Sequence, residues 1–403
     1  MSLFRSLNFS LLFIGRIITN LGDSLYYVIS MWLVYHLTHS SFYSGIAGFL
    51  ILLPETLQFM IGPIISRFSH KALLIYVQVI QSVLLLIIPI LSLFGYLNIY
   101  ILFICIFLSS VINQFNYPTH ISLLPNIVDK RDLTKANSLM TIAYQGTDTI
   151  FNSISGLLLS FMGAMLLYIY NSFLFILVAI IFLFLKIPKT PKINSNSMTF
   201  VFYLKTLKNS ISFVFSTIII KLLYGFILLN FLTGILFAIL PAYSYIEGGK
   251  AYYYGFYLTA MSIGILLGAL TANYFDRFKL GKLHILLFLF SSICFLIFIY
   301  SNSIMSFIFF SLSWVTFGIS NVLLLSTAQK ILKSEDLSII YTVINSLSIF
   351  SMPIGSIFSG VLSFFISPKA LMFLCALLFF TVALIWFMVK DLRNLSKSDT
   401  IHL

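Results

Sequence analysis

The chain has 403 residues, of which 60% are hydrophobic and only 8% are charged. Soluble domains carry about 25% charged residues, so this composition excludes a soluble globular protein and predicts an integral membrane protein. A net charge of +12 is large enough for a nucleic-acid-binding protein, but the basic residues lie between apolar stretches. The three cysteines lie far apart within apolar stretches, a pattern that predicts neither a disulfide framework nor a metal site.

The first apolar stretch, residues 8–38, is long enough to cross a bilayer. It has no small-residue cleavage site, so we interpret it as a retained span and not as a signal peptide. It carries Arg16 and, near its middle, Asp23. A carboxylate at the centre of a span costs about 2.5–3.5 kcal/mol, and such a residue usually faces a water-filled path or a partner. The alternative is a neutral or paired structural residue.

Hydropathy divides the whole chain into twelve apolar segments, each long enough to span a bilayer. The segments of the first half lie at residues 8–38, 43–65, 72–94, 98–121, 136–161 and 164–186. Those of the second half lie at residues 213–241, 252–275, 283–300, 303–326, 338–362 and 369–389. The predicted fold class is therefore an all-α membrane protein with twelve transmembrane helices.

The positions of lysine and arginine predict the orientation of these spans. An even number of spans places both termini on one side of the membrane. If that side is the cytoplasm, 19 of the 23 basic residues fall in cytoplasmic segments, and only Lys250 and Lys369 fall in external loops. This asymmetry follows the positive-inside rule. We expect a multi-pass protein of the cell membrane with cytoplasmic termini and no nucleic-acid partner.

A polar stretch at residues 187–212 contains two prolines and is predicted to be a cytoplasmic linker. It separates an N-terminal six-helix bundle at residues 1–186 from a C-terminal bundle at residues 213–390, which a cytoplasmic tail at residues 391–403 follows.

The two halves share short motifs at one offset. Val128–Leu133 matches Leu332–Leu337, and Ser155-Gly156 matches Ser359-Gly360, each 204 residues apart. Two parallel six-helix repeats are the architecture of many secondary transporters, which bind substrate at the midplane between the halves.

Three motifs of the first half resemble those of a known family. They are Asn20-Leu21-Gly22-Asp23 in the first span, Leu53-Pro54-Glu55 in the second, and the loop at residues 62–71. The loop is similar to the pattern Gly-x-x-x-Asp-Arg-x-Gly-Arg-Lys. On these motifs the chain resembles a major facilitator superfamily transporter, in the branch that contains macrolide-efflux and related drug–proton antiporters.

The resemblance implies a set of gating residues in the loops of both halves. These are Gly62, Arg67, Lys71, Asp276 and Arg277. Ser66 stands where the motif has an acid, and Ser69 and His70 replace its second Gly and Arg, so we expect a weaker inner latch. The antiporter signature Gly-Pro-x-x-x-Gly of the fifth span keeps only Gly156, which leaves the transport direction less well supported than the fold.

The implied function is proton-coupled efflux of amphipathic drugs or macrolide-like compounds by alternating access. The proton gradient takes the place of a cofactor, and the expected partners are a small amphipathic substrate, protons and the lipid bilayer, with the chain as a monomer. The alternative is an exporter or flippase of an endogenous metabolite such as a siderophore or a lysophospholipid. An enzyme is not expected, because the sequence has neither a His-Glu-x-x-His motif nor a Gly-rich Lys loop.

Only three of the eleven acidic residues lie within predicted spans: Asp23, Glu55 and Asp148. Each is near the middle of its span, where its charge is costly. A carboxyl group that gains and loses a proton there would change which conformation is preferred, which is what proton coupling requires. We therefore predict these three residues as proton-coupling groups, with a hydrogen-bonded structural role as the alternative for each.

Polar and aromatic residues of the spans are the candidate substrate wall. Arg16 lies seven residues before Asp23, so the two point to nearly the same helix face; it could bind an anionic group or reach the inner interface. The resemblance implies that the first, fourth, seventh and tenth spans line the cavity. The candidates on the last three are Asn113, Gln114, Asn116, Tyr117, Tyr224, Asn230, Trp314 and Asn321. Hydrogen bonding between helices is the alternative for each.

Overall fold

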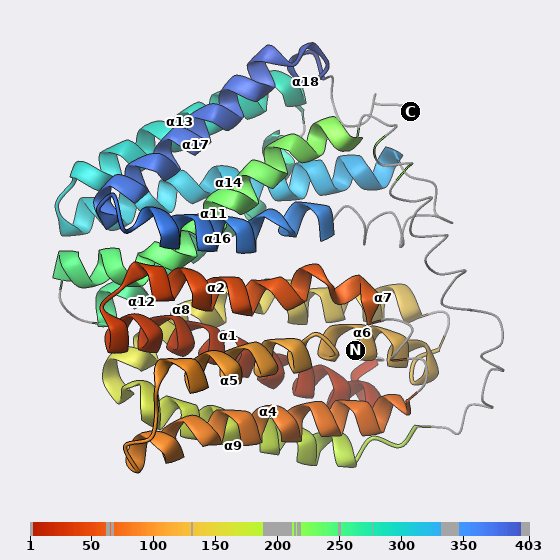
Figure 1. Ribbon diagram of the computed structural model, residues 1–403. Coiled ribbons are helices and arrows are strands. Elements are labelled where there is room, and N and C mark those ends of the chain that lie inside the picture. Colours follow the sequence, from red (N-terminus) through yellow and green to blue (C-terminus); the bar gives the residue numbers. More distant parts are fainter. Residues whose placement is uncertain are drawn as a thin grey trace. The chain divides into compact units, whose positions relative to one another are not determined.

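The computed structural model describes residues 3–61, 65, 68–129, 132–187, 212, 215, 219–248, 251–275, 277–331 and 346–395. Within these ranges all regular secondary structure is helical (Figure 1), as the predicted fold class requires. Nine of the helices that the structure describes are long and apolar enough to cross a membrane. The chain is therefore a multi-pass membrane protein. The count of twelve spans stays a prediction, because residues 188–211 and 332–345 lie outside the described ranges.

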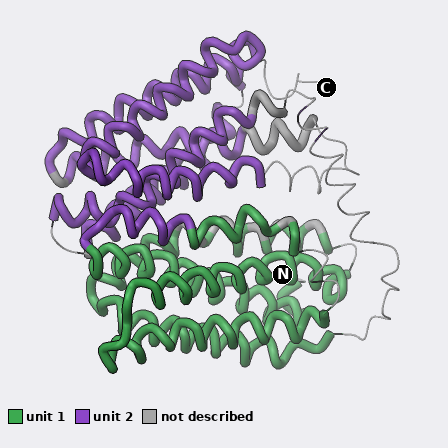
Figure 2. Tube along the Cα trace, in the orientation of Figure 1, with its two compact units in different colours: residues 1–38, 50–203 green, residues 39–49, 204–403 purple. Residues whose placement is uncertain are grey.

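The chain divides into two compact units (Figure 2). Unit 1 comprises Met1–Thr38 and Leu50–Tyr203, and unit 2 comprises His39–Phe49 and Leu204–Leu403. Helix α2 (Ser41–Thr56) contributes to both, since its first residues pack with unit 2. The predicted linker at residues 187–212 lies outside the described residues apart from its two ends, so its boundaries stay predictions.

Unit 1 is built from long helices with two short breaks. Besides part of α2, its helices are α1 (Leu7–Thr38), α4 (His70–Leu93), α5 (Ile99–Asn113), α6 (Asn116–Leu123), α7 (Leu133–Thr141), α8 (Thr147–Met162) and α9 (Ala164–Leu183). Between α7 and α8 the chain forms one π-helical turn, η5 (Ile142–Gly146). The helices α1 and α4 both pack against α9, while α1 also contacts α8 and α5. This arrangement places α1 inside the unit, and 18 of its 32 residues are buried.

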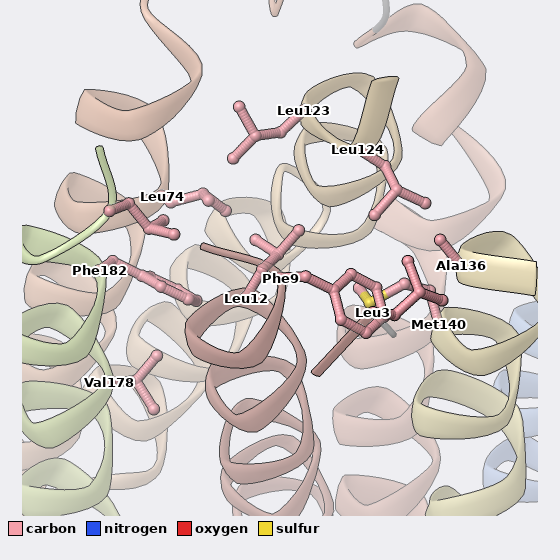
Figure 3. Close-up of a cluster of buried hydrophobic side chains, with 11 residues drawn as sticks. Leu3, Phe9, Leu12, Leu74, Leu123, Leu124, Ala136, Met140, Val178 and Phe182 are labelled. Atoms are coloured by element: carbon pink, nitrogen blue, oxygen red, sulfur yellow. The ribbon is translucent and has the colours of Figure 1, made fainter. Parts of the chain in front are cut away.

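Apolar residues fill one end of unit 1 (Figure 3). Phe9 and Leu12 of α1 lie in this cluster with Leu74 of α4, Phe182 of α9 and Met140 of α7. Gly15, one turn further along α1, faces the ring of Phe182 so closely that a Cβ atom would overlap it. This close packing holds the first turns of α1 against α4, α7 and α9.

Unit 2 contains α11 (Ile219–Gly248), α12 (Ala251–Phe275), α13 (Leu280–Tyr300), α14 (Ser303–Ile331), α16 (Ser351–Leu362), α17 (Pro368–Met388) and the short α18 (Lys390–Arg393). Small residues allow its helices to approach closely, as in many membrane proteins. A Cβ atom on Gly264 or Gly268 of α12 would overlap a backbone carbonyl of α14, and one on Gly318 of α14 would overlap a carbonyl of α12. Near the start of α2, a Cβ atom on Gly45 would overlap the backbone of Gly360 and Ser356 of α16. Ser356 Oγ donates to the Gly45 carbonyl at 3.0 Å.

Aromatic rings occupy the space that remains inside unit 2. Phe298 and Phe310 lie 4.9 Å apart between ring centroids, and Phe295 contacts both of them. Tyr257 of α12 meets Phe310 at 5.4 Å, and Trp314 of α14 meets Phe379 of α17 at 6.1 Å. Most of these contacts are edge-on or tilted, the geometries that aromatic pairs prefer.

Candidate functional site

Three polar residues share one face of α1 in the interior of unit 1. Arg16, Asn20 and Asp23 are four and three residues apart, which places them one above the other along the helix. Arg16 Nη2 donates to Asn20 Oδ1 at 2.9 Å and lies 3.9 Å from Asp23 Oδ2. The guanidinium side chain is 1% exposed and the carboxylate 15% exposed. Arg16 and Asp23, which the sequence places on nearly the same helix face, therefore lie next to each other, with Asn20 beside them.

The π-helical turn η5 packs against this face of α1 and contacts both Asn20 and Arg16. A π turn changes the pattern of backbone hydrogen bonds, and carbonyls there are open to side-chain donors. Asn20 Nδ2 donates to the carbonyls of Ala143 at 3.3 Å and Tyr144 at 2.8 Å. The Tyr144 ring lies under the Arg16 guanidinium, 4.4 Å from its centroid, and stacks on Tyr117 at 4.1 Å. The cation is thus held by a ring face as well as by an amide.

Two donors of Arg16 have no hydrogen-bond partner among the described residues. Nε and Nη1 are buried and unsatisfied, and so are both ring nitrogens of His120 on α6, which lies within electrostatic range of Arg16. The His120 ring packs against Phe182 at 5.6 Å. Buried donors without partners are rare because each costs free energy. This part of unit 1 is therefore suited to an additional acceptor, such as water or an anionic group.

A row of side-chain amides runs from Asp23 to α4. Asn116 Nδ2 donates to Asn113 Oδ1 at 2.7 Å and to Gln81 Oε1 at 3.3 Å. Gln78 Nε2 donates to Asn116 Oδ1 at 2.9 Å. Gln78, Gln81 and Asn116 are each at most 2% exposed. The predicted amide cluster of the fourth span thus lies against two glutamines of α4 and against α1.

The break between α5 and α6 places these amides. Pro118 has no N–H to donate to the carbonyl of Gln114, four residues earlier, and Gln58 Nε2 donates to that carbonyl at 3.4 Å. The Gln114 side chain is 8% exposed, and its Nε2 donates to the carbonyl of Ser110 at 3.2 Å. Gln114 therefore bonds within its own segment, whereas Asn113 and Asn116 reach other helices.

The structure describes fewer contacts for Glu55 and Asp148, the other two predicted proton-coupling acids. Glu55 is partly buried on the last turn of α2, directly after Pro54. Asp148 belongs to the first turn of α8, but its side chain lies outside the described part of the structure. Asp23 is consequently the acid whose surroundings the structure describes in detail.

The predicted substrate residues of unit 2 lie in different environments. Tyr224 on α11 is 45% exposed, and Asn321 on α14 is also exposed. Asn230 Nδ2 donates to the carbonyl of Phe226 in its own helix at 3.0 Å. Trp314 is fully buried and contacts Phe317 at 5.5 Å and Phe379 at 6.1 Å. This tryptophan packs inside unit 2, and a role in binding substrate has no support in its contacts.

The predicted gating residues are described only in part. Gly62, Arg67 and Asp276 lie outside the described residues. Lys71 Nζ donates to the carbonyls of Leu183 and Leu185 at 2.7 and 2.8 Å, and so caps the C-terminal end of α9 within unit 1. Arg277 is exposed, lies 3.6 Å from the Tyr274 ring centroid, and donates to the Tyr274 carbonyl at 2.9 Å.

Sequence reasoning missed several residues of this site. Asn20 appeared only as part of a motif, and Gln78, Gln81, Tyr144 and His120 were not singled out. Amides inside an apolar span are themselves a signal, because they are costly in lipid. The four-residue spacing of Arg16 and Asn20 was a second signal. The described residues contain no group of three or more His, Cys, Asp or Glu side chains that could hold a metal ion.

Comparisons with known proteins agree on the class of the fold. The family described as transmembrane secretion effector matches residues 1–402. A bacterial homologue of the human lysosomal transporter Spinster, inward-facing and unoccupied, has a TM-score of 0.71 at 13% identity, over 97% of this chain and 98% of that chain. A mutant of the nucleoside transporter NupG has a TM-score of 0.73 at 13% identity, over 94% of this chain and 99% of that chain. No curated protein matches the sequence. At these identities the solved structures are similar in fold alone.

Proposed function

Because this chain belongs to the transmembrane secretion effector family of the major facilitator superfamily, and is therefore a secondary transporter, we propose that it exports amphipathic compounds in exchange for protons. The observation that carries the proposal is the Arg16–Asp23 pair inside unit 1, with Asn20 and Asn113 at its sides. A charged pair in the interior of a membrane bundle is costly to keep. Charged residues inside membrane bundles commonly mark ion pathways and proton relays, so a transported charge explains why the pair is present.

Asp23 is the proposed proton-carrying group. While it is ionised, it neutralises Arg16 at 3.9 Å. When it takes up a proton, Arg16 keeps Asn20 as a neutral acceptor but loses its counter-charge. Since opposite charges attract strongly in a poorly hydrated interior, one proton changes the stability of this arrangement. Glu55 and Asp148 are proposed as further acids on the same proton path.

The substrate is proposed to be small and amphipathic. The resemblance to the macrolide-efflux branch and the family's description as a secretion effector both support export. Asn113, Asn116, Tyr117 and Arg16 are the proposed binding residues of unit 1, and Tyr224, Asn230 and Asn321 those of unit 2. We also propose that the chain works as a monomer in the cell membrane, with cytoplasmic termini and the proton gradient as its energy source.

The test is accumulation in inverted membrane vesicles with an imposed proton gradient, using ethidium and erythromycin as probes. Wild-type vesicles are expected to accumulate at least one probe. The proton-driven accumulation rate of Asp23→Asn vesicles is expected to be at least tenfold lower than that of the wild type. Asn171→Leu is the matched control, because it removes another buried amide beside α1. Proton-driven accumulation by Asp23→Asn at the wild-type rate would refute the coupling role.

A second candidate is an exporter or flippase of an endogenous metabolite with an anionic or zwitterionic head group. The unsatisfied Nε and Nη1 of Arg16 favour it, because these donors suit a carboxylate or phosphate. A deletion strain distinguishes the two candidates. Retention of a siderophore under iron limitation, or loss of lysophospholipid movement in vesicles, would support the metabolite over the drug.

A further inference from the structure

The amide of Asn113 has one terminal atom that faces two groups with opposite needs. That atom lies 3.2 and 3.3 Å from the two carboxylate oxygens of Asp23 and 2.7 Å from Nδ2 of Asn116. An oxygen in this place accepts from Asn116 but repels an ionised carboxylate. A nitrogen in this place donates to the ionised carboxylate but opposes the Asn116 donor. A half turn of the Asn113 amide exchanges the two atoms.

The two orientations fit the two charge states of Asp23. A protonated Asp23 has an O–H that donates to Asn113 Oδ1, and this oxygen can accept from Asn116 Nδ2 at the same time. An ionised Asp23 has only acceptors, so it requires the Asn113 nitrogen. The proton on Asp23 therefore decides which way the amide of Asn113 faces.

The next amides of the row can follow this change. Once Asn113 presents its nitrogen, Asn116 gains a bond by turning its own oxygen toward it. Gln81, which accepts from the Asn116 nitrogen at 3.3 Å, turns its amide as well and then donates to the Asn116 oxygen. The Asn116 nitrogen then faces Gln78, whose Oε1 is buried and has no partner among the described residues. After the same half turn Gln78 supplies that oxygen as the acceptor. Chains of hydrogen bonds reinforce one another in such an environment.

We propose that Asn113, Asn116 and Gln78 form a switchable amide row whose hydrogen-bond direction is set by the proton on Asp23. The row links the proton-carrying residue of α1 to α4, through α5 and α6. These three residues act as positioning residues, since none of them carries the proton. The inference rests on the proposed function only in requiring that Asp23 gains and loses a proton.

On α1 itself, Arg16 lies 3.9 Å from Asp23, and Tyr26 is within electrostatic range of it. The titratable groups that the packed elements bring toward α1 are Cys105 of α5, Tyr144 of η5 and Tyr168 of α9. Arg16 favours an ionised Asp23 in every variant described below, so its effect cancels when the variants are compared.

Infrared difference spectroscopy of the full chain in liposomes tests the row without a substrate. A pH titration records the carbonyl band of each protonated carboxyl group, and the component that Asp23→Asn removes belongs to Asp23. In the wild type, side-chain amide bands assigned by isotope labelling of asparagine and glutamine are expected to change at the same midpoint. Amide bands that stay constant while the Asp23 band titrates would overturn the proposal.

A double-mutant cycle tests the path from Gln78 to Asp23. Gln78→Met keeps the length of the side chain but removes the donor to Asn116. It also removes the acceptor that Gln78 would supply in the other direction. The donor bond, which suits a protonated Asp23, is the one that the structure holds, at 2.9 Å. We therefore expect that direction to lose more, and the midpoint to fall by roughly half a pH unit, about threefold in proton concentration. In an Asn113→Leu background the same change is expected to shift nothing, because the row is already interrupted. If Asn113→Leu does not fold, Asn116→Ser interrupts the row at its second member.

Asn171→Leu is the matched control for the cycle. Asn171 is a fully buried amide on α9 that donates to the carbonyl of Gly22 at 2.8 Å, beside Asp23 but outside the row. In this background the shift caused by Gln78→Met is expected to remain. No shift with Gln78→Met, or an equal shift in the Asn113→Leu background, would overturn the row.

The outcomes separate the row from the proposed function. If the carboxyl and amide bands respond as expected while vesicles show no proton-driven transport, the row stands and the proposed function fails. If transport is proton-driven at Asp23 but the amide bands do not respond, the row fails and the function stands. An Asp23 that does not titrate overturns both.

Discussion

The interiors of the two units are built from different side chains. Inside unit 1 a cation, a carboxylate and a row of amides make hydrogen bonds between helices, as Asn116 does with α5 and α4. Inside unit 2 the described contacts are mainly between aromatic rings, with Trp314 and Phe310 at their centre. Its hydroxyl groups largely bond to carbonyls of the same helix, as Thr233 and Ser244 do.

This difference separates a unit arranged around charge from a unit arranged around close packing. Unit 1 keeps groups whose hydrogen bonds depend on protonation, and unit 2 keeps glycine contacts and rings that do not titrate near neutral pH. Polar substitutions inside unit 1 should therefore change transport before stability, and substitutions inside unit 2 should do the reverse. The buried cysteines allow each unit to be followed separately, because Cys105 lies in unit 1 and Cys294 and Cys375 lie in unit 2.

The largest effect on transport is expected from Arg16→Met. The change leaves Asp23 without its cation and Asn20 without its donor. We expect proton-driven accumulation in vesicles to fall by roughly 100-fold, because removing one member of a buried pair leaves the other charge uncompensated. Lys369→Met, which removes an exposed cation near the Tyr300 ring, is the control and should stay within about twofold of the wild type. Equal losses in both variants would break the comparison.

The largest effect on folding is expected from Gly268→Val in unit 2. Its side chain would overlap the Val315 carbonyl across the contact between α12 and α14. Because backbone cannot move aside as a side chain can, we expect about a tenfold loss of folded protein, measured by fluorescence-detected size exclusion. The neighbouring change Leu267→Val is the control, since Leu267 is 48% exposed. Normal yields of Gly268→Val would show that the helices are not held as closely as described.

A smaller effect is expected from Trp314→Phe. The smaller ring leaves a gap among Phe310, Phe317 and Phe379, which costs about 1–2 kcal/mol. Reaction of a thiol dye with Cys294 and Cys375 should begin a few degrees lower than in the wild type, while proton-driven transport stays within about twofold. A large loss of transport at unchanged stability would instead show that Trp314 contributes to substrate binding, as its position in the sequence predicts.

The smallest effect is expected from Lys71→Met. It removes two hydrogen bonds to the C-terminal carbonyls of α9, a loss of about 1 kcal/mol at a helix end. The thiol dye should reach Cys105 at a slightly lower temperature, with transport nearly unchanged. Lys279→Met, which replaces an exposed lysine before α13, should shift neither. If Lys71→Met abolishes transport without changing stability, Lys71 is a gating residue of transport as well as a cap of α9.

The sequence supports the helical fold and part of the site. Long apolar segments identify spans without tertiary information, and seven-residue spacing places Arg16 and Asp23 on one face of α1. It does not show that Asn20 donates to the carbonyls of Ala143 and Tyr144, because that depends on the π turn at residues 142–146. Nor does it show which amides of α4 meet Asn116. A buried Trp314 and a substrate-lining one look alike in sequence, since both need an aromatic residue in a span.

The most direct test compares two kinds of transport by Asp23→Asn in liposomes. An asparagine cannot exchange a proton, but it can hold the neutral form of the site. The labelled probe is the one of ethidium and erythromycin that the wild type accumulates. We therefore predict that Asp23→Asn still exchanges this probe across the bilayer when no proton gradient is present, at a rate within about threefold of the wild type, and accumulates none when a gradient is imposed. Accumulation driven by the gradient in this variant would contradict the account.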